Sequence, residues 1–273
     1  MKKKELQDLL NQLGFHPGKI LGQNFLVDGN MLDYIVRAAD PQPNEWILEA
    51  GPGFGVLTRE LLDAGANVIS IEFDHRICDY LRTNLTNPHF TLVEGDACQV
   101  ELEPLIGDRE FRAIANLPYS ISSIFVARLT ELARPPRSMC FMLQKEMAQR
   151  LAADPQTPNY GALSVNVQLV YDVKLLRMVP PQVFYPQPDV ESAVVEFRRR
   201  DQFPEPDQRR RIVKLSRLAF SQKRKKMVNP LSGSYPKEKI LAAFAKLGIR
   251  DDCRPGQLTP AQFVALTDEL CQP

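Results

Sequence analysis

Short apolar runs alternate with amphipathic stretches along the first 153 residues of the chain. Five runs are short and mostly apolar, as buried strands are, and they cover residues 45–50, 67–72, 90–95, 111–117 and 138–144. Apolar residues at helical spacing follow four of these runs, at 56–65, 75–85, 121–133 and 145–153. Strands that alternate with helices predict the α/β class, with a parallel sheet and helical crossovers.

The pattern changes after residue 153. Residues 154–160 are rich in proline and predict a loop, and the β-branched stretch after them is ambiguous until a strand at 173–179. A further strand is expected at 191–200. Between these two strands, residues 180–189 contain four prolines, which excludes both helix and strand there.

The last quarter of the chain has the pattern of a small all-helical domain. Apolar positions at helical spacing predict helices at 207–220, 236–248 and 259–270. Thr259 is suited to cap the last of them, and Pro260 to its first turn. We therefore predict an α/β domain at 1–200 and a smaller helical domain at 201–273.

The composition of the 273 residues is that of a globular protein, with 44% hydrophobic and 25% charged residues. No apolar run approaches the roughly 20 residues of a membrane-spanning helix, and the amphipathic N-terminus lacks the features of a signal peptide. The five cysteines are scattered, without the C-x-x-C spacing of a metal site. We therefore expect a cytoplasmic protein with reduced thiols, no metal and no membrane partner, and nothing in the sequence signals an oligomer.

The charge of the chain is small in total but unevenly distributed. The formal net charge is +1, yet residues 198–226 contain twelve Lys and Arg against three Asp and Glu, a local net charge of +9. Such a segment suits a polyanionic partner. A solvated helical face would have the same composition, so the charge run alone leaves both interpretations open.

A glycine-rich turn, EAGPGFG at 49–55, joins the first strand to the first helix, and Glu72 ends the next strand. A tight turn without a ligand is one interpretation, and a dinucleotide site is another. The spacing is G-x-G-x-G rather than the G-x-G-x-x-G of dinucleotide sites, and Glu49 would repel a pyrophosphate. Glu49 suits the cationic amino acid end of S-adenosylmethionine, and Glu72 can hold its ribose hydroxyls. We therefore predict that cofactor, approached closely by Gly51 and Gly53.

Polar side chains also follow the third and fourth strands. Asp96 comes after the third strand, where it can accept a hydrogen bond from an adenine amino group or cap the segment that follows. Asn116, Leu117, Pro118 and Tyr119 come at the end of the fourth strand. Because parallel strands end at the same edge of a sheet, where ligands bind, we favour a ligand site over isolated turns.

The NLPY turn suits an enzyme that methylates the amino group of adenine. That amine is a poor nucleophile because its lone pair is delocalised into the ring. The side-chain oxygen of Asn116 and the carbonyl of Leu117 can accept its hydrogen bonds and stabilise the positive charge that develops on nitrogen. Pro118 stiffens the turn, and the ring of Tyr119 can stack on a base. This chemistry requires no metal, no nucleophilic Ser or Cys and no strong general base.

Taken in order, these motifs resemble the family of small-subunit ribosomal RNA adenine dimethyltransferases. KILGQNFLVD, at 19–28, is similar to its N-terminal signature, and EAGPGFGVLT, VEGDA and ANLPYSIS are similar to its cofactor and target motifs. MLQKEMAQRL, YGALSV and VFYPQPDVESAVVEF resemble its later motifs, and AFSQKRKKMVNPL and RPGQLTPAQFVAL resemble its C-terminal domain. The resemblance implies a Rossmann-like S-adenosylmethionine-dependent methyltransferase domain, followed by a helical RNA-binding domain.

The resemblance also implies roles for individual residues. The cofactor would be held at its methionine part by Glu49 and Gly51, at its ribose by Glu72, at its adenine by Asp96, and along its length by Gln23, Asn24 and Leu26. The target adenine would be held by Asn116, Leu117 and Tyr119, with Phe184 as the opposite stacking wall, and Asn116 would also contact the cofactor. The residues expected to bind RNA are Arg209, Arg210, Arg211, Lys223, Arg224, Lys225 and Lys226.

By the same resemblance, the expected activity is dimethylation of N6 of two adjacent adenosines in the 3′-terminal hairpin loop of small-subunit (16S) rRNA, on the immature small ribosomal subunit. Ser120 stands where Asn is common in the family, and Val228 where Arg is expected. Residues 187–189 lie in a stretch whose charge varies in the family. These departures bear on RNA contacts and rates rather than on the class of reaction.

Three other functions compete with this one. Large-subunit rRNA or DNA adenine methylation would use the same cofactor domain, but RPGQLTPAQFVAL favours the small-subunit branch. A ribosome-assembly factor would not need the site residues of a methyltransferase, although an assembly role can coexist with catalysis. An NAD-dependent enzyme is disfavoured by the glycine spacing and the NLPY turn.

Overall fold

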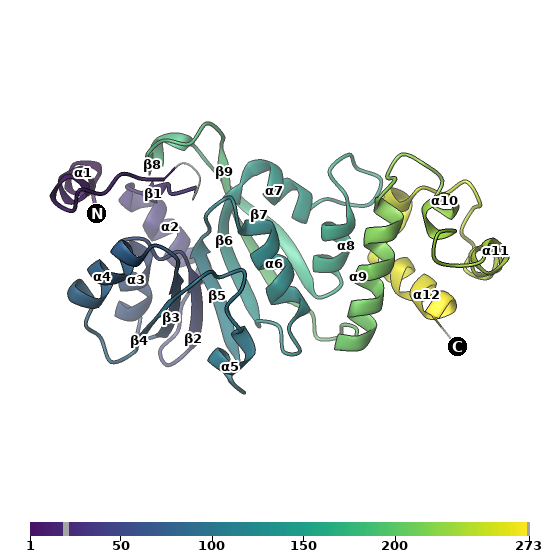
Figure 1. Cartoon of the computed structure of the whole chain (residues 1–273), viewed down its shortest axis with the longest axis horizontal. Coiled ribbons are helices and arrows are strands. Elements are labelled where there is room, and N and C mark those ends of the chain that lie inside the picture. The colour runs from purple at the N-terminus through teal and green to yellow at the C-terminus, as the bar shows by residue number, and fades with distance from the viewer. Residues whose placement is uncertain (19–21, 272–273) are drawn as a thin grey trace. The chain divides into compact units, whose positions relative to one another are not determined.

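The computed structural model describes residues 1–18 and 22–271, and it divides the chain into two compact units (Figure 1). The first unit contains residues 1–128, 136–148 and 174–198, and the second contains 129–135, 149–173 and the chain from Arg199. The predicted domain boundary lies at 200–201, whereas residues 129–135 and 149–173 cluster with the C-terminal helices. No helix in the described ranges is both long enough and apolar enough to cross a membrane.

A seven-stranded sheet carries the α/β part of the chain. In the order in which they pair, its strands are β4 (Phe90–Glu94), β3 (Asn67–Glu72), β2 (Trp46–Ala50), β5 (Phe111–Asn116), β6 (Ser138–Gln144), β9 (Ser192–Arg199) and β7 (Tyr171–Val179). The pairs β3–β4, β2–β3, β2–β5 and β5–β6 are parallel, and β9 is antiparallel to β6. The predicted α/β fold with a parallel sheet is confirmed, and β9 adds an antiparallel strand to it.

Helices connect the strands and cover both faces of the sheet. Along the chain they are α2 (Gly29–Ala39), α3 (Val56–Asp63), α4 (His75–Asn84), α5 (Leu102–Ile106), α6 (Ser122–Glu131) and α7 (Lys145–Leu151). Ile35 of α2 and Leu61 of α3 belong to one buried cluster with Met142 of β6. Phe141, the next residue along β6, packs instead on Phe125 of α6, with ring centroids 6.2 Å apart. Successive side chains of β6 therefore point to opposite faces of the sheet and pack into two separate parts of the core.

The strand order places a topological switch point between β2 and β5. The chain adds β3 and β4 on one side of β2, then returns to add β5 and β6 on the other side. In open α/β sheets, ligands bind at the carboxyl ends of the strands beside such a point. The turns that follow β2 and β5 meet there, since a Cβ atom on Gly51 would lie 2.9 Å from Cγ of Pro118.

The N-terminal part of the first unit contains elements that the sequence analysis did not predict. Helix α1 (Lys3–Gln12) precedes β1 (Phe25–Leu26), and β1 pairs antiparallel with β8 (Phe184–Tyr185). A 3-10 turn, η1 (Pro181–Val183), comes directly before β8. The exclusion of both helix and strand from 180–189 was therefore wrong. A strand of two residues fits here because no proline occupies a paired position, and the carbonyl of Val183 accepts a hydrogen bond from Val27 N at 2.8 Å.

The second unit is helical, as the sequence predicted for the end of the chain. Its helices are α8 (Ala162–Gln168), α9 (Pro206–Phe220), α10 (Val228–Leu231), α11 (Lys237–Lys246), η2 (Pro255–Gln257) and α12 (Pro260–Cys271). The three predicted helices correspond to α9, α11 and α12, and Thr259 Oγ1 accepts a hydrogen bond from Gln262 N as the expected cap. The ambiguous stretch becomes α8 followed by β7.

Candidate active site

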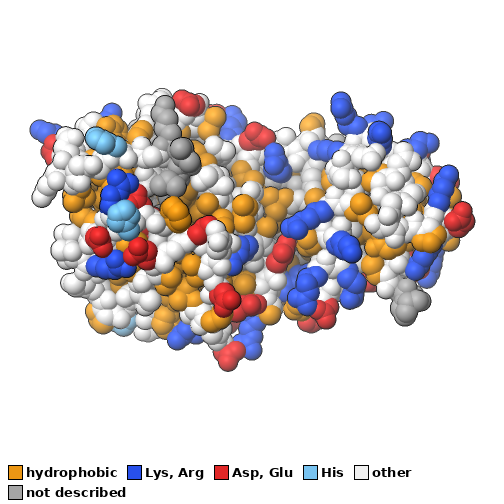
Figure 2. All heavy atoms as spheres, viewed as in Figure 1, with side chains coloured by type: hydrophobic (Ala, Val, Ile, Leu, Met, Phe, Trp, Pro, Cys, Tyr) orange, Lys and Arg blue, Asp and Glu red, His pale blue; other side chains and the backbone are white. Residues whose placement is uncertain are grey.

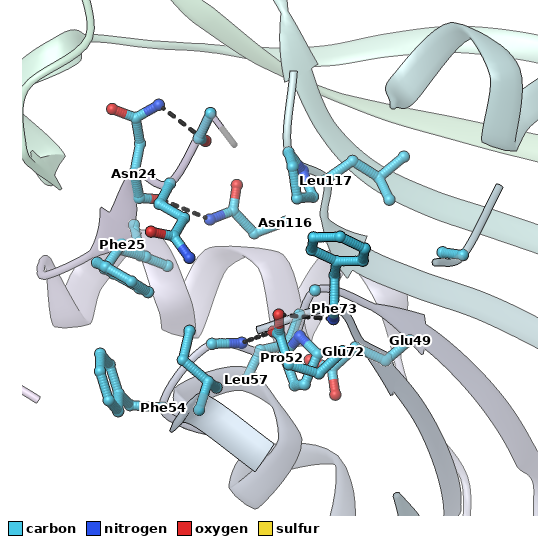
Figure 3. Close-up of a pocket in the computed structure, with 18 of the residues that line it drawn as sticks. Asn24, Phe25, Glu49, Pro52, Phe54, Leu57, Glu72, Phe73, Asn116 and Leu117 are labelled. Carbon is cyan, nitrogen blue, oxygen red and sulfur yellow. Dashed lines mark hydrogen bonds between the residues drawn. The ribbon is translucent and has the colours of Figure 1, made fainter. Parts of the chain in front are cut away.

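A cavity of 230 Å³ lies at the carboxyl ends of the parallel strands, beside the switch point (Figure 3). The glycine-rich turn, the segment 22–26, and the ends of β3, β4 and β5 form its walls. Most of the residues predicted from sequence line it together: Gln23, Asn24, Leu26, Glu49, Gly51, Gly53, Glu72, Asp96, Asn116, Leu117, Pro118 and Tyr119. Residues 19–21 of the N-terminal signature lie outside the described residues.

Two glycines of the turn have no room for a side chain. Gly51 and Gly53 have φ values of +67° and +53°, in the left-handed region that favours glycine. A Cβ atom on Gly53 would lie 3.1 Å from the ring of Phe25, and one on Gly51 would collide with Pro118. The bare backbone therefore forms part of the cavity wall, as close approach to a ligand requires.

Glu49 is a buried carboxylate at the mouth of this turn. Only 1% of its surface is exposed, and its Oε2 accepts hydrogen bonds from Thr58 Oγ1 at 2.8 Å and Ser70 Oγ at 2.7 Å. Burial raises the pKa of Glu49 to about 7, although the two hydroxyl donors oppose that rise. The nearby carboxylate of Glu72 also raises this pKa. The site therefore holds an acid that is poised to ionise near neutral pH.

We expect Glu49→Gln to stabilise the cofactor-free protein at pH 8 more than at pH 5. Between the ordinary pKa of 4.5 and about 7, folded Glu49 holds a proton that the unfolded chain has lost, so stability falls as pH rises through this window. Glutamine removes that loss, which has an upper limit of about 3 kcal/mol. Denaturant unfolding at both pH values measures the difference, with Asp63→Asn, exposed on α3, as the control. Equal stability changes at both pH values would contradict the shifted ionisation.

Glu72 ends β3 with its carboxylate fixed by three backbone groups. Its Oε1 accepts from the N–H groups of Phe73 and Asp74, each at 2.9 Å, and its Oε2 accepts from Gly53 N at 3.4 Å. Glu72 is 6% exposed. Burial raises the pKa of Glu72, although the three backbone donors lower it in part. The carboxylate is thus held in place before any ligand binds.

The remaining predicted cofactor residues surround these two carboxylates. Asp96 lines the cavity, while its Oδ1 accepts from Cys98 N at 2.8 Å and its Oδ2 from Gln99 Nε2 at 2.7 Å. Asp96 therefore caps the segment that follows it and also lines the cavity, so its predicted contact with an adenine amino group stays a prediction. Gln23 accepts from Gly18 N at 2.8 Å and donates to Asp74 at 3.2 Å, which ties the N-terminal segment to the end of β3.

Asn116 ends β5 across the cavity from the glycine-rich turn. Its Nδ2 donates to the carbonyl of Asn24 at 3.3 Å (Figure 3). No described residue donates a hydrogen bond to its Oδ1, so this oxygen is available as an acceptor. The next residue, Leu117, is buried, and its N–H donates to the carbonyl of Met142 at 3.2 Å. The orientation of the turn is thereby fixed by the sheet on one side and by the N-terminal segment on the other.

Comparison with known proteins decides the family. The sequence profile described as ribosomal RNA adenine dimethylase matches residues 15–272. This chain belongs to that family. It is therefore an S-adenosylmethionine-dependent methyltransferase, as the sequence predicted. The donor set of the cavity fits that cofactor: the turn has bare glycines, two carboxylates are fixed, and the described residues that line the cavity include no Lys or Arg side chain for a pyrophosphate.

Relatives cover nearly the whole chain. Ribosomal RNA small subunit methyltransferase A of Clostridium acetobutylicum is 35% identical over 277 residues, which is 99% of each protein. The protein of the same name from Chlamydia trachomatis is 37% identical over 96% of this chain and 95% of its own. Among solved structures, a dimethyladenosine transferase from Plasmodium falciparum has a TM-score of 0.74 at 26% identity, and covers 89% of this chain and 95% of its own. The 23S rRNA methyltransferase ErmE has a TM-score of 0.68 at 28% identity, over 91% and 100%.

The two aromatic residues predicted to hold the target adenine lie in different surroundings, one at the cavity and one in the core. Tyr119 lines the cavity, and its hydroxyl lies 2.6 Å from Ser192 Oγ. Burial raises the pKa of Tyr119, so its hydroxyl remains protonated. Phe184 is 2% exposed and belongs to the core cluster with Leu26, and it does not line the cavity.

Several residues of the site were not predicted from sequence. Phe25, Phe54 and Phe73 add aromatic walls, and Phe73 is 61% exposed at the cavity although it is large and apolar. Thr58 and Ser70 support Glu49 from behind the cavity wall. Ser70 did carry a signal in the sequence, since a hydroxyl interrupts the otherwise apolar run NVISIE.

Most of the predicted RNA-binding cations lie in the second unit on an exposed groove. Lys223, Arg224, Lys225 and Lys226 line this groove of 1090 Å³ together with Arg250 and Arg254. Arg210 and Arg211 are also exposed, and Arg210 forms an ion pair with Asp207. Figure 2 shows Lys and Arg side chains over much of the viewed face of this unit.

Arg209 differs from the other predicted cations because the structure buries it. It is 3% exposed, and its guanidinium donates to the carbonyls of Thr130 and Leu132, both at 2.8 Å, and of Ala133 at 3.3 Å. These carbonyls lie at and just beyond the C-terminal end of α6, where helix carbonyls lack partners within the helix. Arg209 therefore has a structural role in the second unit, and it offers nothing to a phosphate at the surface.

Proposed function

We propose that this enzyme dimethylates N6 of two adjacent adenosines in the 3′-terminal hairpin loop of small-subunit rRNA during assembly of the small ribosomal subunit. One observation carries the chemistry: Asn116 lies at the switch point with its Nδ2 engaged by Asn24, which leaves its Oδ1 as an acceptor beside the glycine-rich turn. The names of the curated relatives support the small subunit as substrate. We further propose that the enzyme works as a monomer in the cytoplasm.

The cofactor is proposed to lie along the carboxyl edge of the sheet. Glu49 and Gly51 would hold its methionine part, Glu72 its ribose and Asp96 its adenine. From the N-terminal segment, the cofactor would be contacted by Gln23, Asn24 and Leu26. Gly53 would let the cofactor approach the backbone of the glycine-rich turn closely. When bound, S-adenosylmethionine supplies an activated methyl group on a sulfonium.

The turn after β5 is proposed to hold the amine that is methylated. Asn116 Oδ1 and the carbonyl of Leu117 would accept its hydrogen bonds, and so stabilise positive charge on the nitrogen as the bond to carbon forms. Pro118 leaves the turn rigid without adding a donor. The base must leave its stack to reach this cavity, which costs least in a loop. Tyr119 would stack on it, and for Phe184 to form the opposite wall its ring would have to leave the core.

The basic groove of the second unit is proposed to bind RNA phosphates. Its cations project from an exposed surface, and an array of this kind binds nucleic acid by releasing counterions. Arg210 and Arg211 would extend the contact along α9. Arg209 is left out of this proposal because its guanidinium is buried and already hydrogen-bonded.

We expect alanine at Lys223, Arg224, Lys225 and Lys226 together to weaken binding of the small subunit and to lower the salt dependence of binding. If all four contact phosphates, the slope of log K against log salt falls in magnitude by about 3. Filter binding over a salt series measures this slope. Alanine at Lys237 and Lys239, exposed on α11 and outside the groove lining, is the control. An unchanged slope would mean that residues 223–226 form only a solvated surface and do not contact RNA phosphates.

Methyl transfer to large-subunit rRNA is the second candidate, favoured by the similarity to the 23S rRNA methyltransferase ErmE. The deciding experiment offers labelled S-adenosylmethionine with undermethylated small subunits, large subunits or DNA, and digests the products to nucleosides. Dimethyladenosine from small subunits alone would support the proposal. Dimethyladenosine from large subunits would overturn the substrate, and cofactor binding without any transfer would favour an assembly role.

A further inference from the structure

Two buried hydroxyl groups converge on one oxygen of Glu49. Thr58 and Ser70 are both 0% exposed, and both donate to Oε2 of Glu49, at 2.8 and 2.7 Å. Neither side chain lines the cavity, whereas Glu49 does. No described residue donates a hydrogen bond to the other oxygen, Oε1. The arrangement therefore divides the carboxylate into one oxygen that is anchored and one that is free to meet a ligand.

Packing alone does not explain a hydroxyl at either position. Ser70 lies between Ile69 and Ile71 in the buried strand β3, directly opposite Glu49 in the register of β2 and β3. Thr58 lies in the first turn of α3, directly after the glycine-rich turn. An apolar side chain would fill either place without the cost of burying a hydroxyl. Both hydroxyls instead donate to the same carboxylate, which points to a requirement set by Glu49.

We propose that Thr58 and Ser70 are positioning residues that hold Glu49 with its Oε1 turned to the cavity, so that this oxygen can accept a hydrogen bond from the ammonium group of S-adenosylmethionine. This inference rests on the proposed function of Glu49 as the residue that holds the methionine part of the cofactor. It assigns to the two hydroxyls a function in binding, beyond that of filling the core.

The electrostatics around Glu49 give the inference a measurable signature. Burial and the carboxylate of Glu72 favour the protonated form of Glu49, and the two hydroxyl donors favour the charged form. An ammonium group of a ligand also favours the charged form, so binding would release the proton of Glu49. Affinity should then rise with pH until free Glu49 is ionised, near its pKa of about 7. It should fall again as the α-amino group of the ligand loses its proton, near pH 7.7–8.0.

The test is the pH profile of cofactor affinity in Thr58→Val and Ser70→Ala, measured by calorimetry from about pH 5.5 to about 8.5. Loss of one hydrogen bond to a charged group should weaken binding at pH 7 by roughly tenfold or more. The acid limb of the profile should move to higher pH, because a donor that lowered the pKa of Glu49 is gone. The alkaline limb belongs to the ligand and should stay in place.

Matched controls separate this effect from general damage to the fold. Thr58→Ser keeps the donor and should restore both affinity and the acid limb. Thr267→Val removes another fully buried hydroxyl, which donates to the Phe263 carbonyl in the second unit, and should change neither. Methylthioadenosine lacks the amino acid end of the cofactor, so its affinity should not depend on Thr58 or Ser70 at any pH.

The outcomes distinguish this inference from the proposed function. If Glu49→Gln binds S-adenosylmethionine as tightly as the natural protein at pH 7.5, the proposed function of Glu49 fails. If Glu49→Gln weakens binding but Thr58→Val and Ser70→Ala leave the acid limb where it was, the inference alone is overturned. Thermal melting identifies any variant that does not fold. If one of the two hydroxyl variants does not fold, the pH profile of the other decides the outcome, since each variant removes one donor to Glu49.

Discussion

Alanine at position 116 is expected to give a folded protein that binds S-adenosylmethionine but transfers methyl groups roughly a hundredfold to a thousandfold more slowly, the usual loss when one group that stabilises a transition-state charge is removed. No described residue donates a hydrogen bond to Asn116 Oδ1, and this oxygen lies at the turn where the amine is proposed to dock. The half-buried position tolerates a smaller side chain. The defect should therefore lie in the rate of transfer and not in stability.

Single-turnover transfer to undermethylated small subunits, with cofactor and subunit both saturating, measures this rate directly. Asn84→Ala removes a carboxamide at the end of α4, outside the residues that line the cavity, and should transfer at the natural rate. Transfer by Asn116→Ala at the natural rate would refute the acceptor role. A loss of cofactor affinity in parallel with the rate would instead assign Asn116 to the cofactor.

The elements that sequence predicted best are those decided by local patterns. Strands 67–72 and 138–144 were expected and found with the same bounds, because short apolar runs between turn residues have few alternatives in an α/β chain. The cavity was predictable for a related reason. Its residues follow separate strands, and parallel pairing brings the carboxyl ends of those strands to one edge whatever the intervening helices contain.

The parts that sequence did not predict depend on contacts between distant segments. Strands β1 and β8 have two residues each and are separated in sequence by more than half the length of the chain, so no local pattern reveals their pairing. Phe184 is buried by that pairing, although its motif suggested a residue open to a base. Helix α2 did carry a signal in its own sequence, since Met31, Leu32 and Ile35 have helical spacing.

Arg209 shows how a charge count can mislead. The run of three arginines at 209–211 predicted three surface cations, yet Arg209 is buried with Ile212, Val213 and Ser216 on one face of α9. Those positions follow Arg209 by three, four and seven residues, which is the spacing of a helix face turned to the core. The unfilled carbonyls at the end of α6 explain why an arginine can occupy that face.

Glu72→Ala is expected to weaken binding of S-adenosylmethionine roughly tenfold to a hundredfold, the range for loss of a hydrogen bond to a charged group. Glu72 is proposed to hold the ribose hydroxyls, and its carboxylate is oriented in advance by the N–H groups of Phe73, Asp74 and Gly53. Glu72→Gln keeps the shape but not the charge, so its affinity should lie between those of the alanine variant and the natural protein.

A ligand without one ribose hydroxyl makes the test specific. The natural protein should bind S-adenosylhomocysteine more tightly than its 2′-deoxy analogue, and Glu72→Ala should bind the two alike, because the preference comes from the hydrogen bond that the variant lacks. A preference that survives in Glu72→Ala would mean that another group reads the ribose. Burial raises the pKa of Glu72, so its charge costs folding stability as pH rises. The melting temperature of Glu72→Gln relative to the natural protein should therefore rise between pH 5 and pH 8, and a difference that does not change with pH would contradict this account, in which the carboxylate serves the ligand at the expense of the fold.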